Sequence, residues 1–97
     1  MKSLEEIINI LSKQKNLLEK EYYIKKIGIF GSYSRGEQNE NSDLDILVDL
    51  NEPVNLLKLV KVENYIQDIT GLKVDLLPRN DIREEIKENI LKEVVFV

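Results

Sequence analysis

The sequence contains no cysteine and no histidine among its 97 residues. The absence of cysteine excludes disulfide bonds, thiolate metal sites and a cysteine nucleophile. The absence of histidine removes the commonest general base and the commonest zinc ligand. Any acid–base or metal chemistry in this chain must therefore depend on carboxylates.

Long apolar runs and an excess of positive charge are also missing. The uninterrupted apolar runs are only a few residues long, so we expect no transmembrane span. The N-terminal segment MKSLEEIINI lacks the basic-then-apolar layout of a secretion signal, which makes the cytoplasm the expected location. The net charge of −4 argues against direct, extended binding to nucleic acid, which depends on lysine and arginine. Small ligands, metal ions or a protein partner fit this composition better.

The residues that are present are typical of one globular domain. Hydrophobic residues make up 42% of the chain and charged residues 33%, an ordinary balance for a folded protein. The length predicts a single domain over residues 1–97. We find no internal repeat, low-complexity segment or interdomain linker.

Hydrophobic patterning predicts three strands. Runs rich in β-branched and aromatic residues, bounded by glycine, polar loops or proline, indicate them. These strands cover residues 24–30, 44–50 and 72–77, and Pro78 ends the last. Residues 31–36 form a turn or a single helical turn, and residues 37–42 form a polar loop.

Helical spacing predicts three helices. The first begins at a capping box formed by Ser3 and Glu6. The second begins near Pro53 and ends at Gly71, and the third opens at Asp81. Their apolar faces consist of Leu4, Ile7, Ile8, Leu11 and Leu18, then Val62, Tyr65, Ile66 and Ile69, then Ile82, Ile86 and Ile90. The element order indicates a small sheet covered by helices. The final VVFV is an edge strand, a packed terminus or a partner surface.

Two aspartates lie one residue apart at the start of the second predicted strand. Because residues two apart in a strand point to the same face, Asp43 and Asp45 face one way. The apolar residues Leu44, Ile46 and Val48 face the other. The aspartate Cα atoms are expected about 6.6 Å apart, which lets both carboxylates reach one cation or bracket a pair of ions. Magnesium prefers such hard oxygen ligands together with phosphate oxygens.

A further acid, Asp75, lies in the third predicted strand and faces away from Val74 and Leu76. If this strand lies beside the second, Asp75 could reach the same site as a metal ligand or as the base for an attacking hydroxyl. Asp49 shares the face of Asp45, but about 13 Å separates them, which excludes Asp49 as a third ligand.

The Gly31-Ser32 pair follows the first strand and enters the turn. Glycine lets the backbone approach a ligand closely, and the N–H groups of such a turn can bind phosphate. The Ser32 hydroxyl can donate one more hydrogen bond, and Arg35 supplies a planar cation suited to phosphate. Phosphate donors beside two metal-binding carboxylates are what a nucleoside triphosphate and its metal require.

Each feature has a plainer interpretation when it stands alone. A Gly-Ser pair is usually only a turn, and the SDLD segment could be a cap followed by a solvent-facing residue. Asp75 could be an exposed strand residue, and Arg35 could be a surface cation or pair with Glu37. Only the co-occurrence of these features favours a nucleotide site.

Taken together, the pattern resembles the DNA polymerase β-like nucleotidyltransferase superfamily and, within it, the minimal nucleotidyltransferase (MNT) domains. The residues that carry the resemblance are Gly31-Ser32, the Asp43-Leu44-Asp45 motif after ten intervening residues, the Arg35-Gly36 step and Asp75. It covers nearly the whole chain, with Ser34 in place of the alanine that is common before Arg-Gly.

The resemblance implies an α/β (α+β) fold, with a small mixed β-sheet flanked by helices and an open active face. It implies that Gly31 and Ser32 hold the triphosphate of ATP. It further implies that Asp43 and Asp45 bind Mg²⁺ and that Asp75 completes the triad of metal-binding acids.

The resemblance also implies a role and a partner. MNT proteins are commonly antitoxins of bacterial and archaeal toxin–antitoxin pairs, with a HEPN-domain ribonuclease as toxin. Such proteins can transfer AMP from ATP onto a tyrosine of the HEPN protein, which is the function we expect here. Two alternatives stay open, namely an antitoxin that acts by binding alone and a nucleotidyltransferase that acts on a small molecule or an RNA end.

Overall fold

The structure is a computed structural model that describes residues 2–53 and 55–97. Its centre is a four-stranded sheet in the order β3-β2-β1-β4. β1 (Ile24–Phe30) pairs antiparallel with β2 (Leu44–Leu50) and with β4 (Val95–Phe96). β2 pairs in parallel with β3 (Val74–Pro78). The mixed sheet flanked by helices confirms the expected fold class.

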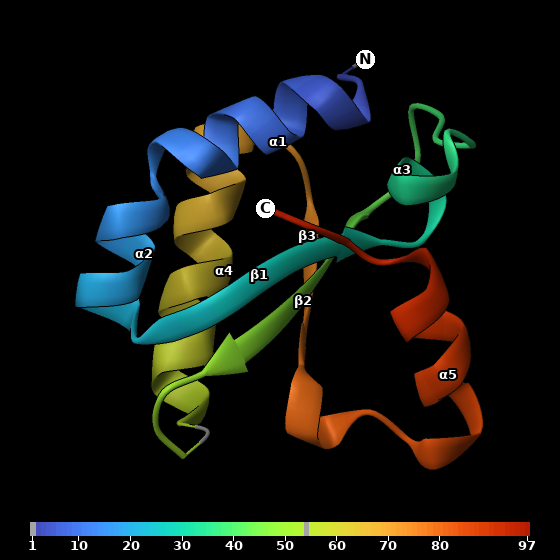
Figure 1. Cartoon of the computed structure of the whole chain (residues 1–97). Helices are drawn as coiled ribbons and strands as arrows, with labels where there is room; N and C mark the ends of the chain where they lie inside the picture. Colours follow the sequence, from blue (N-terminus) through green and yellow to red (C-terminus); the bar gives the residue numbers. More distant parts are fainter. Residues whose placement is uncertain (1, 54) are drawn as a thin grey trace.

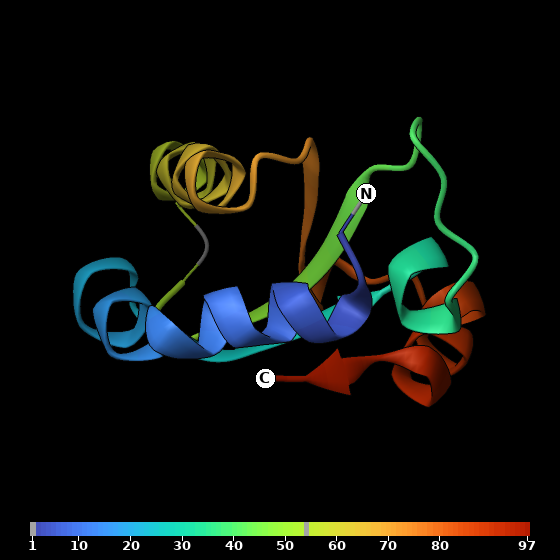
Figure 2. The same ribbon diagram turned by 90° about the horizontal axis from the view of Figure 1, so that it is seen from above.

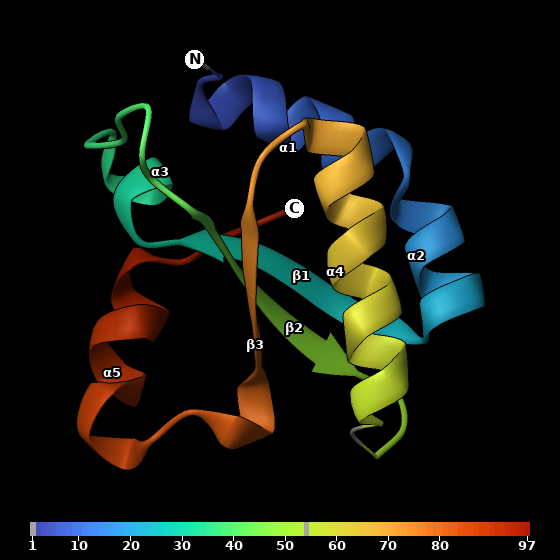
Figure 3. The same cartoon turned by 180° about the vertical axis from the view of Figure 1, so that it is seen from behind.

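The helices lie at two ends of the molecule (Figures 1 and 3). α2 (Lys15–Tyr22) and α4 (Leu56–Thr70) lie at one end, and α1 (Leu4–Lys13) runs from there toward the other. The one-turn helix α3 (Ser32–Arg35) and α5 (Glu84–Glu93) lie at the other, as the view from above also shows (Figure 2). α4 provides the crossover that two parallel strands such as β2 and β3 require.

The larger hydrophobic core lies between the sheet and α1, α2 and α4. Its strand residues alternate along the sheet, as the period-two pattern of β2 predicts. They are Ile27 and Ile29 of β1, Leu44, Ile46 and Val48 of β2, and Val74 of β3. Ile24 of β1 also belongs to this core and lies before a shift in the strand register. Full burial of each such side chain contributes about 1.5–3 kcal/mol to folding.

A smaller core lies on the opposite face of the sheet. Its buried members are Leu47 of β2 and Ile82 and Ile90 from the C-terminal region, with Phe30 and Leu77 packed against them. α5 therefore covers only part of this face, and the strand ends that carry the aspartates stay outside this core.

Several local predictions are confirmed. β1 and β2 have the predicted bounds, and Ser3 and Glu6 form the predicted capping box. Gly71 ends α4 with a φ of 71°, in the left-handed region where glycine is favoured. VVFV contains the short edge strand β4, so the edge-strand interpretation is correct.

The extents of the first two predicted helices were wrong. α4 starts at Leu56 rather than near Pro53, because the Asn55 side chain caps the N–H groups of Leu57 and Lys58. The expected first helix is divided at Gln14 into α1 and α2.

The region after β3 also differs from the prediction. Pro78 belongs to β3, which tolerates it because an edge strand has one side without ladder hydrogen bonds. Asp81 ends the 3₁₀ turn η1 (Arg79–Asp81) rather than opening a helix, and α5 begins at Glu84. The backbone is extended at Ile82, whose side chain enters the smaller core. This shift leaves Ile86 45% exposed, so it does not face inward as predicted.

None of the helices in residues 2–53 and 55–97 is long and apolar enough to cross a membrane.

Candidate active site

The two aspartates of the DLD motif lie at the beginning of β2. Asp43 precedes the strand and is exposed, whereas Asp45 is its second residue and is half-buried. The neighbours Leu44 and Ile46 are fully buried in the larger core. Strand alternation therefore directs Asp45 to the opposite face of the sheet, as predicted.

β3 brings the third predicted acid to the same place. Asp75 is the direct cross-strand partner of Asp45 in the parallel β2–β3 pair. Neighbouring strands lie about 4.8 Å apart, so side chains at paired positions on one face approach each other closely. The condition set for Asp75, that the third strand lies beside the second, is therefore met, and Asp75 is exposed to solvent there.

The electrostatics of Asp45 show how crowded the acids are. Burial raises the pKa of its carboxyl from 3.8 to about 6, and the charges of Asp75 and Asp43 add to this effect. Arg35 opposes the rise but does not cancel it. A carboxylate held among like charges in a partly dry position is a place where a cation would be stabilised.

The donor set fits magnesium rather than a softer metal. It consists of carboxylate oxygens, which Mg²⁺ prefers, and Mg²⁺ usually takes one or two carboxylates with phosphate oxygens and water. Within the described residues, no group of three or more acids forms a complete metal site by itself. A Mg²⁺ ion that is also bound to phosphate oxygens would therefore suit Asp43 and Asp45, with Asp75 beside them.

Gly31 makes the closest backbone approach to these acids. Its φ of 76° and ψ of −152° lie in a region that is essentially restricted to glycine. A Cβ atom on Gly31 would lie 2.1 Å from Oδ2 of Asp45. Glycine is required here both by the backbone conformation and by the carboxylate that fills the space of a side chain.

The turn that follows is closed by hydrogen bonds to the Gly31 carbonyl. The carbonyl oxygen accepts from the N–H groups of Ser34 and Arg35 at 3.1 and 3.2 Å. The Ser34 hydroxyl donates to the same oxygen at 2.9 Å, a contact that an alanine would lack. The first N–H groups of α3, which begins at Ser32, have no partner within that helix and point from its N-terminus. They are suited to bind phosphate oxygens.

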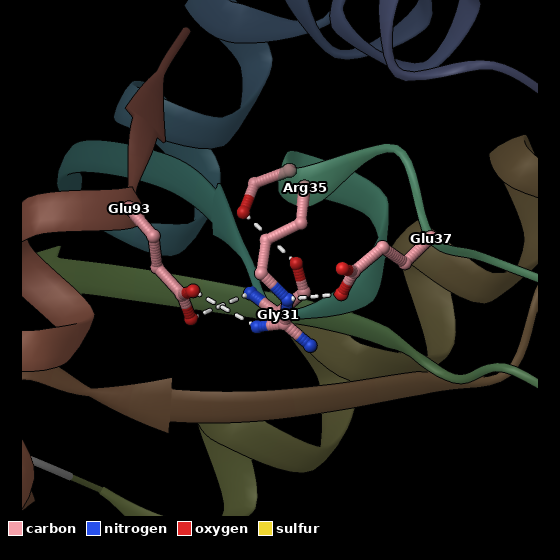
Figure 4. Close-up of polar contacts among 5 residues, drawn as sticks. Gly31, Arg35, Glu37 and Glu93 are labelled. Atoms are coloured by element: carbon pink, nitrogen blue, oxygen red, sulfur yellow. Dashed lines mark hydrogen bonds and ion pairs between the residues drawn. The ribbon is translucent and has the colours of Figure 1, made fainter.

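Arg35 is held between two carboxylates (Figure 4). Its Nε donates to Oε1 of Glu37 at 2.7 Å, and its Nη1 donates to Oε2 of Glu93 at 2.9 Å. These hydrogen bonds, that of Glu37 first, raise the pKa of the guanidinium, which therefore stays charged. The pairing with Glu37 was one of the plainer interpretations of the sequence, and it is present.

Sequence reasoning missed Glu93. Its Oε1 accepts from the N–H of Gly31 at 3.1 Å, in addition to the contact with Arg35. Glu93 is one of several glutamates in α5, and no local pattern distinguishes it. Asp49, excluded by distance, instead lies 3.6 Å from Nη1 of Arg79.

Comparison with known proteins places a chain of this fold among the nucleotidyltransferases. The sequence profile of the nucleotidyltransferase domain family matches residues 11–97. A Methanocaldococcus jannaschii relative with the provisional name protein adenylyltransferase MJ1217 is 48% identical over the whole of both chains. Protein adenylyltransferase MntA of Thermococcus cleftensis is 44% identical over all of this chain and 98% of its own. The chain belongs to the nucleotidyltransferase domain family and, within it, to the protein adenylyltransferases.

Solved structures agree on the fold. A minimal nucleotidyltransferase superposes with a TM-score of 0.83 and 26% identity, covering 97% of this chain and 95% of that one. A toxin–antitoxin structure with AMP-PNP gives a TM-score of 0.70 at 22% identity, over 96% of this chain and 70% of that one. A chain from a complex of tri-AMPylated Shewanella oneidensis HEPN toxin with MNT antitoxin gives 0.61 at 17%, over 96% and 66%. The last two likenesses concern the fold.

Proposed function

We propose that this chain is an antitoxin that transfers AMP from ATP to a tyrosine of a cognate HEPN-domain toxin and thereby neutralises it. The observation that carries the proposal is the convergence of Asp43, Asp45 and Asp75 beside the Gly31 turn. The relatives named as protein adenylyltransferases support the reaction. The solved complex of an AMPylated HEPN toxin with an MNT antitoxin supports the partner.

Different residues of the chain would bind the phosphates of ATP and the metal ion. The start of α3, including the Ser32 hydroxyl, would bind phosphate oxygens of ATP, and Arg35 would add a positive charge. Asp43 and Asp45 would hold Mg²⁺, with Asp75 as the third acid. When bound, Mg²⁺ supplies charge neutralisation on the phosphates and on the departing pyrophosphate.

The reaction follows from this placement. The tyrosine oxygen forms a new bond to the α-phosphorus of ATP, and the bond from that phosphorus to the pyrophosphate oxygen breaks. The proton of the tyrosine hydroxyl must pass to a base. Asp75 is exposed to solvent, so an incoming hydroxyl can reach it, and it is the proposed proton acceptor as well as part of the acidic triad.

The test uses the purified chain, Mg²⁺-ATP and the cognate HEPN protein. Intact-mass spectrometry should show the HEPN protein gaining the mass of AMP, with the added group on tyrosine after peptide mapping. Asp43→Ala should abolish the adduct, and Asp49→Ala, on the same strand, should retain it. No adduct with the wild-type chain would rule out the transfer.

Toxicity assays separate transfer from binding alone. If Asp43→Ala neutralised the toxin as well as the wild-type chain, the chain would act by binding its partner. An adduct on RNA ends or small molecules but not on the HEPN protein would instead indicate a different acceptor.

A further inference from the structure

Glu93 joins the last turn of α5 to the turn that follows β1. One carboxylate oxygen accepts from the N–H of Gly31 at 3.1 Å, and the other accepts from Nη1 of Arg35 at 2.9 Å (Figure 4). Gly31 and Arg35 stand at the two ends of the α3 turn. The Glu93 side chain is 26% exposed, so solvent weakens these bonds less than it would at the open surface.

We propose that Glu93 is a positioning residue, which holds the Gly31 turn and the Arg35 guanidinium in the orientation that binds the phosphates of the nucleotide. This inference rests on the proposed function, in which that turn and Arg35 contact ATP. Glu93 itself need not touch the nucleotide.

The shortness of α3 is the physical reason for such a support. A single helical turn of four residues cannot hold its own shape in water, since helix formation is unfavourable until several turns exist. The turn is already held by hydrogen bonds to the Gly31 carbonyl and by the buried side chain of Tyr33. A carboxylate bonded to both ends of the turn adds a restraint on its orientation, and the bond to Arg35 is charge-assisted and therefore strong.

Charge alone would argue against a glutamate at this position. Glu93 adds negative charge near Asp45, and its charge contributes to the raised pKa of that carboxyl. A fourth acid beside three others disfavours the approach of a triphosphate. The proposed role of Glu93 therefore depends on its two hydrogen bonds and not on its charge.

Glu37 provides a matched comparison. It also pairs with Arg35, at 2.7 Å, but it is more exposed and follows Arg35 by only two residues. Its carboxylate bonds to the guanidinium, whereas that of Glu93 also bonds to the Gly31 backbone. If pairing with Arg35 were sufficient, both glutamates would matter equally.

The first experiment needs no nucleotide. Amide hydrogen exchange of Gly31 is measured by NMR in the full-length wild-type chain and in Glu93→Asp and Glu37→Gln. Aspartate keeps the charge but is one methylene shorter, so we expect Gly31 to exchange about tenfold faster in Glu93→Asp and little faster in Glu37→Gln. Equal exchange in the wild-type chain and Glu93→Asp would overturn the proposal.

The second experiment measures the affinity for Mg²⁺-AMP-PNP by calorimetry. Glu93→Asp should bind about tenfold more weakly. Glu93→Gln, which keeps an acceptor for the Gly31 N–H, should lose less affinity than Glu93→Asp, and Glu37→Gln should lose least. Tighter binding by Glu93→Asp or Glu93→Gln would mean that the carboxylate competes with phosphate, and would overturn the proposal.

The two experiments separate this inference from the proposed function. If the wild-type chain does not bind Mg²⁺-AMP-PNP, the phosphate role of the turn fails together with the proposed function. The exchange of Gly31 still decides whether Glu93 orders the turn. Wild-type binding with unchanged affinity in every Glu93 variant would leave the proposed function intact and reject the positioning role.

Discussion

The two faces of the sheet use the same strands for different purposes. On one face, Leu44, Ile46 and Val48 of β2 are at most 1% exposed and belong to the larger core. On the other face, Asp45 alternates with them and meets Asp75 of β3 across the strand boundary. The difference shows that a two-residue period lets one short strand support both a core and a site.

The two faces of the sheet also contribute differently to the stability of the fold. The larger core is apolar on every inward position of β2, whereas the opposite face holds a carboxyl whose pKa is raised to about 6. A group with a raised acid pKa is less favourable when it is charged in the folded chain than when the chain is unfolded. The acidic face therefore opposes folding slightly, and a bound cation would remove that opposition.

The largest effect is expected from removing an acid of the site. Asp43→Ala and Asp45→Ala should each lower the rate of AMP transfer at least about 1000-fold, because metal binding supplies several kcal/mol of transition-state stabilisation. Circular dichroism should show a retained fold. Asp49→Ala is the control on the same strand, and a similar loss there would mean that negative charge in general, not this constellation, is required.

Substitutions in the larger core should change the stability of the fold rather than the rate of AMP transfer. Ile27→Ala removes a side chain that is 2% exposed in the larger core and should lower the free energy of unfolding by about 3 kcal/mol. Urea denaturation measures this loss, and Lys26→Ala at the exposed neighbouring position is the control. Lost transfer activity in the folded Ile27→Ala protein would contradict the separation of the two faces.

The two glycines that flank the α3 turn, Gly31 and Gly36, should respond differently to substitution. Gly31→Ala places a methyl group against Asp45 and should lower kcat/KM for AMP transfer about 30-fold, or about 2 kcal/mol. Gly36 also has a positive φ, but a Cβ atom there meets nothing within 4 Å. Gly36→Ala should cost about 1–2 kcal/mol of stability and keep transfer. Equal activity of both variants would show that the turn tolerates displacement.

The smallest effect concerns pH. The folded pKa of Asp45, about 6, lies above its unfolded value near 3.8, so the folded chain binds more protons between these values. Without metal, stability should therefore fall as the pH rises through that window. Asp45→Asn should raise the thermal midpoint by about 2–4 °C at pH 7.5 and have little effect near pH 4. Scanning calorimetry measures both midpoints.

Asp49→Asn serves as the control for this titration, since Asp49 lies near Arg79 instead of among acids. It should not gain stability at pH 7.5. If Asp45→Asn and the wild-type chain differed in thermal midpoint by the same amount at every pH, packing against Gly31 rather than charge would explain the effect of the substitution.

Much of the candidate site was predictable because it depends on local patterns. The side to which Asp45 points follows from strand alternation. The tight turn after β1 follows from the glycine at position 31. The errors arose where short-range signals competed. Pro53 suggested a helix start that Asn55 makes instead, and Asp81 ends a 3₁₀ turn because Ile82 must remain extended to reach the smaller core.

β1, β2, the capping box and the side to which Asp45 points can be read from the sequence, because each depends on residues only a few positions apart. The pairing of Asp75 with Asp45 and the contact of Glu93 with Gly31, 62 residues away, arise only in the folded chain. Strand order and helix placement follow from how the whole chain buries its apolar surface, and that balance is not written in any local pattern.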